Sequence, residues 1–211
     1  MEALRGNPAP ERPDPFAGLT RGYYRVIAAD PPWHYATFSD KGKRRSADRH
    51  YRTLTIPALT DLPVGELAAP DAHLMLWITG PMIVQGAHLP LMRAWGFEPS
   101  ALLFVWLKAK RGAADAFLPL DQSLFAMGLG YTSRQNAELV ILGRRGNPQR
   151  LRKDIHQLII APRREHSRKP DEFYDRARAY AAGPYLELFG REIRPAWTTW
   201  GDEREKFGGQ P

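Results

Sequence analysis

Cysteine is absent from the 211-residue chain, and its six histidines show no close ligand spacing. The absence of cysteine excludes a disulfide framework and a thiolate zinc site, and the histidine spacing predicts no other metal site. No apolar run approaches the roughly 18 residues that a membrane span needs, and no signal-type apolar segment opens the chain. We therefore expect a cytoplasmic protein with no membrane association.

Positive charge is in excess, since the chain has 30 lysines and arginines but 23 acids, which gives a net charge of +7. Such an excess favours a polyanionic partner such as nucleic acid. The length fits one domain, which we expect over residues 16–207. A proline-rich mobile arm is expected before it at 1–15, and a short tail after it at 208–211. A monomer, a homodimer and a heterodimer all remain open.

Short apolar runs alternate with helical spacing along most of the chain. This alternation predicts an α/β fold with a mostly parallel sheet flanked by helices. Strands are expected at 24–29, 73–79, 102–107, 138–143, 157–161, 185–191 and 197–203. Helices are expected at 55–67 and 81–95, and from about 171 to a stop near Gly183-Pro184.

The segment Asp30-Pro31-Pro32-Trp33 directly follows the first predicted strand. Two consecutive prolines stiffen the turn and remove two N–H donors, which leaves the carbonyls of Asp30 and Pro31 as free acceptors. Trp33 offers a flat face, and stacking of a base on such a face contributes roughly 1–3 kcal/mol. Together these groups suit an amino-substituted heterocycle. A strand-ending turn with a tryptophan in the core is the alternative interpretation.

Two basic segments could contact phosphates. The first is a polar loop after the proline motif, which is either a phosphate-binding lid or a solvated loop. The second brackets the strand predicted at 157–161 and holds nine cations against two acids, which indicates a fixed basic surface. The candidate nucleic-acid-binding residues are Lys41, Lys43, Arg44 and Arg45 in the first segment and Arg144, Arg145, Arg163 and Arg164 in the second.

The last two predicted strands follow a nucleotide-binding pattern. Gly190 comes at the end of one strand, where backbone can approach a ligand, and Asp202 and Glu203 end the next, where a carboxylate can bind ribose hydroxyls. One glycine is a weak signal on its own.

Four motifs, in order, make the chain from about Phe16 to Glu203 resemble a known family of adenine-N6 methyltransferases. The family includes the catalytic subunit of the eukaryotic messenger-RNA adenosine methyltransferase and many phage enzymes, and the likeness is greatest to its short bacterial and phage branch. The motifs are Asp30-Pro31-Pro32-Trp33, His166-Ser167-Arg168-Lys169-Pro170-Asp171-Glu172, Glu187-Leu188-Phe189-Gly190-Arg191, and Pro195-Ala196-Trp197 with Trp200-Gly201-Asp202-Glu203.

The resemblance implies a Rossmann-like class I methyltransferase that uses S-adenosylmethionine, with the catalytic motif before the cofactor motif in a permuted order. It implies that Lys169 meets the methionine carboxylate and that Asp202 and Glu203 reach the ribose or adenine. Asp202 departs from the branch, which usually has asparagine there, and the change removes an amide donor. The residues expected to line the cofactor cleft are Glu187, Phe189, Gly190 and Arg191.

The catalytic group implied by the resemblance is Asp30, Pro31, Pro32 and Trp33. Asp30 and the Pro31 carbonyl would each accept one N–H of the adenine amine. The expected activity is methylation of adenine N6 in nucleic acid, with DNA favoured over RNA. A catalytically silent nucleic-acid-binding subunit and a methyltransferase for another amine are the alternatives.

Overall fold

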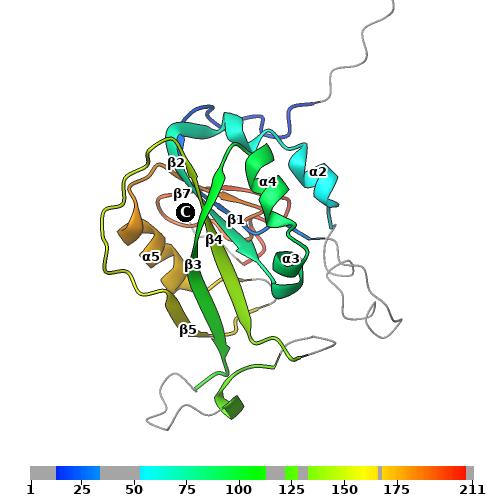
Figure 1. Ribbon diagram of the computed structural model, residues 1–211, viewed down its shortest axis with the longest axis vertical. Coiled ribbons are helices and arrows are strands. Elements are labelled where there is room, and N and C mark those ends of the chain that lie inside the picture. Colours follow the sequence, from blue (N-terminus) through cyan, green and yellow to red (C-terminus); the bar gives the residue numbers. More distant parts are fainter. Residues whose placement is uncertain (1–12, 34–52, 113–121, 128–132, 166–167, 208–211) are drawn as a thin grey trace, which may run out of the picture.

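The computed structural model describes residues 13–33, 53–112, 122–127, 133–165 and 168–207. Seven strands form one sheet in the order β5-β3-β4-β2-β1-β6-β7 (Figure 1). The strands are β1 (Tyr24–Ala29), β2 (Ala68–Ile78), β3 (Glu98–Ala109), β4 (Ala137–Arg145), β5 (Leu158–Pro162), β6 (Tyr185–Leu188) and β7 (Trp197–Trp200), and the helices are α2 (Ile56–Thr60), α3 (Gly80–Val84), α4 (His88–Ala94) and α5 (Asp171–Tyr180).

The sheet is mostly parallel, which confirms the predicted fold class. Strand β4 pairs antiparallel with both β2 and β3, whereas the other neighbouring pairs are parallel. Ala29 lies level with Leu76 of β2 on one side and Leu188 of β6 on the other. The carboxyl ends of these strands therefore meet at one edge of the sheet, and β4 begins there.

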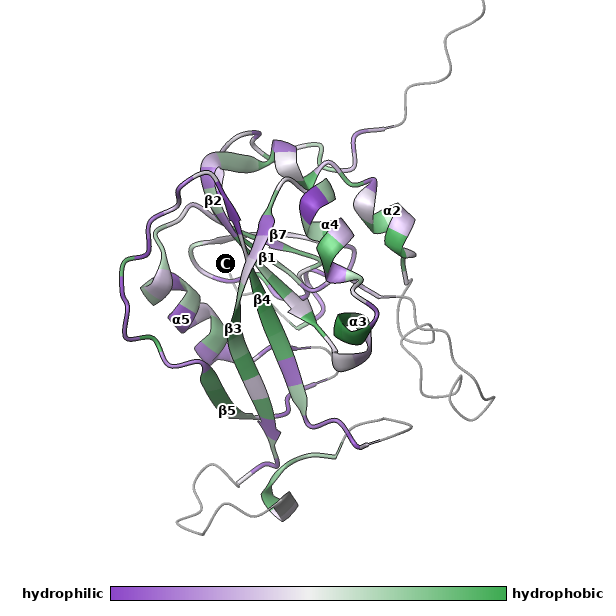
Figure 2. Cartoon of the chain, viewed as in Figure 1, coloured by the Kyte–Doolittle hydropathy of each residue, from purple (hydrophilic) through white to green (hydrophobic). Residues whose placement is uncertain are grey.

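Each face of the sheet carries its own apolar core. Ile27 and Ala29 belong to the core that α2 and α4 cover, whereas Val26 and Ala28 belong to the core under α5. Alternate residues of one strand point to opposite faces, so a central strand covered on both sides must be apolar throughout. Figure 2 shows these apolar strands, and the largely hydrophilic connection from β4 to β5.

Two of the predicted helices are interrupted. The helix expected at 81–95 is divided into α3 and α4 by Gly86, which has a φ of 67°. The helix expected at 55–67 ends as α2 at Thr60 and is followed by a short 3₁₀ turn at Val64–Glu66, because Pro63 cannot supply a helical N–H. The third begins at Asp171 after Pro170, with two acids in its first turn, as the sequence predicts. It ends at Tyr180, before the expected stop near Gly183-Pro184, because the backbone is already extended at Ala181.

The end of the expected arm that the structure describes packs on the domain. Phe16 is fully buried and its ring lies edge-on to Trp200, with centroids 4.9 Å apart. The Trp200 indole donates to the Pro15 carbonyl at 3.0 Å. Residues 1–12 of the arm and the tail at 208–211 lie outside the described residues. Within the part described, no helix is both long and apolar enough to cross a membrane.

Candidate active site at the carboxyl edge of the sheet

The strand order brings the proline motif and the later motifs together. Because β1 lies between β2 and β6, Asp30 comes next to the segment that follows β6, and its N–H donates to the Leu188 carbonyl at 3.5 Å. The Gly190 N–H donates to the Trp200 carbonyl at 3.0 Å, which joins the ends of β6 and β7. The motif that comes first in the chain therefore lies beside the motifs that come last, as the permuted order requires.

A chain of alternating charges runs through this edge. Lys169 Nζ lies 3.0 Å from Asp30 Oδ2 and 2.7 Å from Glu138 Oε2. Glu138 also pairs with Lys108 of β3. The Lys169 ammonium lies 4.7 Å from the centroid of the Trp77 ring, and its side chain is only 7% exposed. Asp30 is thus held by a buried cation.

The buried groups in this series of alternating charges stay ionised because each is stabilised by neighbours of opposite charge. Burial alone would lower the pKa of Lys169, but the charges of Asp30 and Glu138 raise it above its ordinary value. Burial alone would raise the pKa of Glu138, but Lys169 and Lys108 lower it. Sequence reasoning missed Glu138 and Lys108. An acid directly before the apolar run 139–142 of β4 was the available signal, and only the antiparallel direction of β4 brings it to this edge.

Glu187 lies in a pocket next to Asp30. The Tyr174 hydroxyl donates to Glu187 Oε1 at 2.6 Å, and Oε2 has no hydrogen-bond partner within the described part of the chain. Glu187 is 8% exposed, and this burial raises its pKa to about 7, with Asp30 adding to the effect. The pocket is lined by Asp30, Arg168, Lys169, Tyr174, Glu187, Phe189, Arg191, Glu192 and Phe207.

The turn after β6 has a strained and tightly packed backbone. Phe189 has a φ of 60°, a left-handed conformation that side chains other than glycine adopt at a cost of about 1–3 kcal/mol. At Gly190 a Cβ atom would clash with Thr199 of β7 and would lie 3.1 Å from Glu187 Cγ. Strand β6 ends at Leu188, earlier than predicted, because the backbone turns there.

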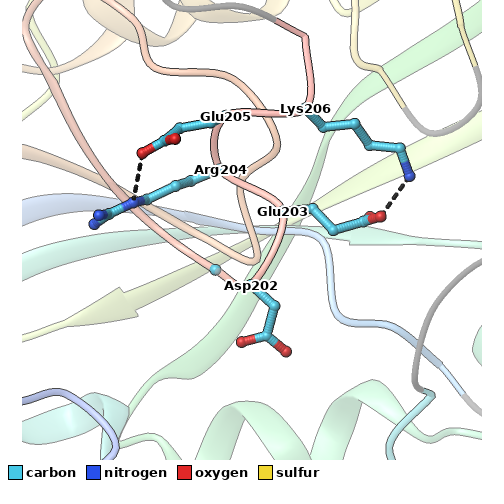
Figure 3. Close-up of a pocket in the computed structure, with 6 residues that line it drawn as sticks. Asp202, Glu203, Arg204, Glu205 and Lys206 are labelled. Carbon is cyan, nitrogen blue, oxygen red and sulfur yellow. Dashed lines mark hydrogen bonds and ion pairs between the residues drawn. The ribbon is translucent and has the colours of Figure 1, made fainter.

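A second pocket lies in the turn after β7, lined by residues 201–206 (Figure 3). Arg191 Nε lies 3.4 Å from Glu203 Oε2, so this turn is attached to the segment that follows β6. Glu203 also pairs with Lys206, whereas Asp202 is exposed and shares none of the interactions drawn in Figure 3. The structure therefore places Lys169, Glu187, Phe189 and Arg191 around the pocket next to Asp30. Glu203 is linked to that group through Arg191, and Asp202 lines the second pocket.

The proline motif differs in two details from what its sequence predicts. The Pro31 carbonyl is not free, because it accepts from the Trp33 N–H at 2.8 Å, although a carbonyl has a second lone pair. Pro32 also uses its carbonyl, as acceptor for Leu54. Trp33 is only 4% exposed and belongs to the core, so it does not present an open face for stacking. The apolar surroundings explain this, because burying the indole removes it from water.

The predicted basic residues are divided between the two edges of the sheet. Arg144 and Arg145 end β4 opposite His73 and Ala72, at the edge remote from Asp30, and Arg145 donates to a backbone carbonyl. The antiparallel direction of β4 places them there, so they do not extend the candidate site.

The other predicted arginines, Arg163 and Arg164, follow β5 at the carboxyl edge. Arg163 is exposed, and Arg164 pairs with Asp171 at 2.6 Å. Lys41, Lys43, Arg44 and Arg45 lie outside the described residues. Among the residues described, no group of three or more metal-binding side chains occurs.

The mostly parallel sheet and the site at its carboxyl edge define a class I methyltransferase fold. The MT-A70 family pattern matches residues 24–203, and the chain belongs to the MT-A70 family. It is 31% identical over 206 residues to the type II methyltransferase M.MunI of a Mycoplasma species, covering 89% of this chain and 81% of that protein.

Other relatives are larger. The chain is 30% identical to the human N(6)-adenine-specific methyltransferase METTL4 over 89% of its own length, but it spans only 39% of that protein. It is 28% identical to the N6-methyladenosine RNA methyltransferase MTA1 of Cryphonectria parasitica, covering 97% of this chain and 58% of that protein.

Proposed function

We propose that the chain is an S-adenosylmethionine-dependent methyltransferase that modifies the N6 amine of adenine in nucleic acid, with DNA as the favoured polymer. The observation that carries this proposal is the position of Asp30, which shares one pocket with Lys169, Glu187 and Arg191. Membership of the MT-A70 family supports the reaction. The likeness to M.MunI and to the RNA methyltransferase relative supports nucleic acid as the substrate. The preference for DNA follows from the resemblance to the short bacterial and phage branch of the family.

The charges of the pocket fit the proposed cofactor. S-adenosylmethionine has a sulfonium, an ammonium and a carboxylate, so it needs both acceptors and cations around it. Glu187 Oε2 is a buried acceptor with no partner among the described groups, and Lys169 supplies a buried ammonium that uses two of its three N–H donors on Asp30 and Glu138. When bound, the cofactor supplies an electrophilic methyl group.

The cofactor residues divide by the part of the molecule that they would hold. Lys169 would hold the methionine carboxylate, and the segment after β6, with Glu187, Phe189, Gly190 and Arg191, would line the cleft. Glu203, which Arg191 holds at 3.4 Å, and Asp202 would meet the ribose or adenine.

Asp30 and the Pro31 carbonyl would orient the target amine. The nitrogen lone pair of adenine is delocalised into the ring, so the enzyme must turn it toward the methyl group. Asp30 accepting one N–H and the second lone pair of Pro31 accepting the other would hold the nitrogen in a tetrahedral arrangement. Such orientation can supply roughly 7–11 kcal/mol of the barrier. The amine proton becomes acidic only as the new bond forms, so Asp30 need not be a strong base.

Transfer of tritiated methyl groups tests the proposal. DNA, RNA and free nucleosides are offered in parallel, and the modified base is identified by mass spectrometry after digestion. N6-methyladenine in DNA is the expected product. Labelling of RNA alone would mean that the substrate is RNA and not DNA. Labelling of no substrate despite cofactor binding would favour a catalytically silent subunit.

A further inference from the structure

Arg194 occupies a buried position in the segment between β6 and β7. Its side chain is 13% exposed, Nη1 lies 2.7 Å from Asp171 of α5, and Nη2 donates to Glu192. Its guanidinium carbon lies 4.0 Å from the centroid of the Tyr174 ring. A planar guanidinium stacked on an aromatic ring makes a specific contact, which is strengthened where the pair is shielded from water.

The ring on which Arg194 stacks belongs to the tyrosine that anchors Glu187. The Tyr174 hydroxyl donates to Glu187 Oε1 at 2.6 Å, while Oε2 is buried without a partner in the described structure. Glu187 and Tyr174 both line the pocket with Asp30. The position of Tyr174 therefore determines which carboxylate oxygen remains available in the pocket.

The same arginine is linked to the opposite side of the pocket. Glu192, which accepts from Arg194, also accepts from Arg168 Nε at 3.0 Å. Arg168 immediately precedes Lys169, whose ammonium pairs with Asp30. One connected set of contacts thus joins Arg194 to the residues on both sides of the pocket.

We propose that Arg194 is a positioning residue of the cofactor pocket, which acts through Tyr174 to hold Glu187 in place as a carboxylate. This inference deepens the proposed function and rests on it for the identity of the ligand. Arg194 itself is not among the residues that line the pocket. A merely structural arginine would tie the segment after β6 to α5 without affecting the ionisation of Glu187.

The charges around Glu187 make the two roles separable. Burial has the largest effect on the pKa of Glu187 and raises it, and the charge of Asp30 raises it further. The Tyr174 hydrogen bond and the charges of Arg194 and Lys169 lower this pKa. The result is a pKa of about 7. The pKa of Tyr174 is itself raised far above its ordinary value by burial and by Glu187, so the hydroxyl remains a donor. Removing the Arg194 charge should therefore raise the pKa of Glu187 further.

The first test measures cofactor affinity against pH. S-adenosylhomocysteine is titrated calorimetrically into the whole chain, its Arg194→Gln and Arg194→Lys variants, and an Arg178→Gln control. Arg178 pairs with Asp175 on the surface of α5, the helix that carries Tyr174. Because binding is proposed to need the Glu187 carboxylate, a rise of one unit from a pKa of about 7 predicts about fivefold weaker binding at pH 7 in Arg194→Gln, about tenfold weaker binding at lower pH, and recovery at about pH 8.5. The affinity of Arg194→Lys at pH 7 should lie between those of Arg194→Gln and the wild type. The Arg178→Gln control should bind as the wild type does.

The second test needs no ligand. The Glu187 carboxyl is titrated by ¹³C nuclear magnetic resonance, with its signal assigned from Glu187→Gln. Its midpoint should rise by about one unit in Arg194→Gln, which corresponds to about a tenfold change in affinity below both midpoints and about a fivefold change at pH 7. Tyr174→Phe, which removes the hydroxyl and keeps the ring, should raise it too, and this variant tests the link through Tyr174. Arg194→Lys, whose midpoint should rise less than one unit but remain above that of the wild type, decides the matter for Arg194 if Arg194→Gln does not fold.

An unchanged Glu187 midpoint in these variants, or an affinity loss that is equal at every pH, would overturn the proposal for Arg194. A shifted midpoint in a protein that binds no S-adenosylhomocysteine would instead refute the proposed cofactor and leave the coupling of Arg194 to Glu187 intact.

Discussion

Asp30 is the residue on which the proposed chemistry depends. Replacement by asparagine keeps the size of the side chain but removes the charge that orients the amine and pairs with Lys169. We expect Asp30→Asn to lower kcat by about 10²–10³-fold, the usual cost of losing one preorganised electrostatic contact. Affinity for S-adenosylhomocysteine should fall little.

Methyl-transfer kinetics and calorimetry measure these two effects separately. Asp154→Asn is the matched control, because Asp154 forms an exposed pair with Arg152 away from the pocket. Wild-type turnover in Asp30→Asn would remove Asp30 from the mechanism.

Glu138 links the site to acid stability. Its pKa is lowered from an ordinary 4.5 to about 2, since Lys169 and Lys108 outweigh the effect of burial. A group whose folded pKa is depressed stabilises the fold above its ordinary pKa, and that contribution is lost as pH falls from about 4.5 to about 2. At pH 7, Glu138→Gln should lower the free energy of unfolding by about 3 kcal/mol, because it removes the carboxylate that Lys108 and the buried Lys169 share.

The difference between Glu138→Gln and wild type should therefore shrink as pH falls through that window. Urea unfolding at several pH values measures it, with the exposed Glu205→Gln as control. A difference that does not change with pH would mean that Glu138 stabilises the fold by packing alone.

Individual residues could be predicted where one short motif carries the chemistry. Asp30, Lys169 and Glu187 all lie in such motifs, and the structure brings them together. Glu138 and Arg194 could not be found in this way, because their partners come from distant segments. The pairing of Glu138 with Lys169 follows from the direction of β4, and the stacking of Arg194 follows from how α5 packs under β6.

At the scale of elements, the turn after β6 sets the shape of the pocket. A Cβ at Gly190 would clash with Thr199 and press on Glu187. We expect Gly190→Ala to destabilise the fold by about 1–3 kcal/mol and to weaken S-adenosylhomocysteine binding about tenfold, because Glu187 must move. Thermal unfolding and calorimetry measure the two effects.

Gly22→Ala is the matched control for Gly190→Ala. Gly22 has a φ of 63° and no atom within 4 Å of an added Cβ, so alanine there costs about 1 kcal/mol by backbone strain alone. Its affinity for the ligand should match the wild type. Equal affinity in both variants would show that the turn can shift without moving Glu187.

The strands and helices could be predicted where the spacing of apolar residues determines them. Their ends were harder to predict where a turn determines them. All seven strands follow apolar runs, but β2 starts at Ala68, earlier than its continuous apolar run, since pairing with β1 and β4 extends it. The amphipathic period of 81–95 continues across the break at Gly86, so the pattern alone indicates one helix. Trp33 was ambiguous because a buried and a stacking indole look alike in sequence.

At the scale of the whole molecule, the two ends of β4 have different surroundings. Glu138 lies near its start, at the edge that carries Asp30, and Arg144 and Arg145 form its end at the other edge. A run of cations in the sequence is therefore divided in space, and only its later part, after β5, reaches the candidate site. Net charge alone favours a polyanion but does not say over which edge it lies.

This division predicts which arginine contacts nucleic acid. Arg163 and Arg144 are both exposed, but only Arg163 lies at the carboxyl edge, where its N–H donates to Ala109 at the end of β3. Each phosphate contact contributes about one unit to the slope of log affinity against log salt. Arg163→Gln should therefore reduce that slope by about 1 and weaken binding of an adenine-containing oligonucleotide at low salt, whereas Arg144→Gln should change neither.

Fluorescence anisotropy over a series of salt concentrations compares the two variants directly. They are a matched pair, since each removes one exposed positive charge and both should alter stability by no more than about 0.5 kcal/mol. Each variant lowers the net charge of +7 by one, so the general attraction to the polymer falls equally in both. A difference between the two variants therefore reports the position of the arginine alone. The opposite result, with the slope reduced only in Arg144→Gln, would mean that the polymer crosses the amino edge of the parallel strands. Its adenine would then have to reach Asp30 from the far side of the sheet, and the proposed site could not act on it.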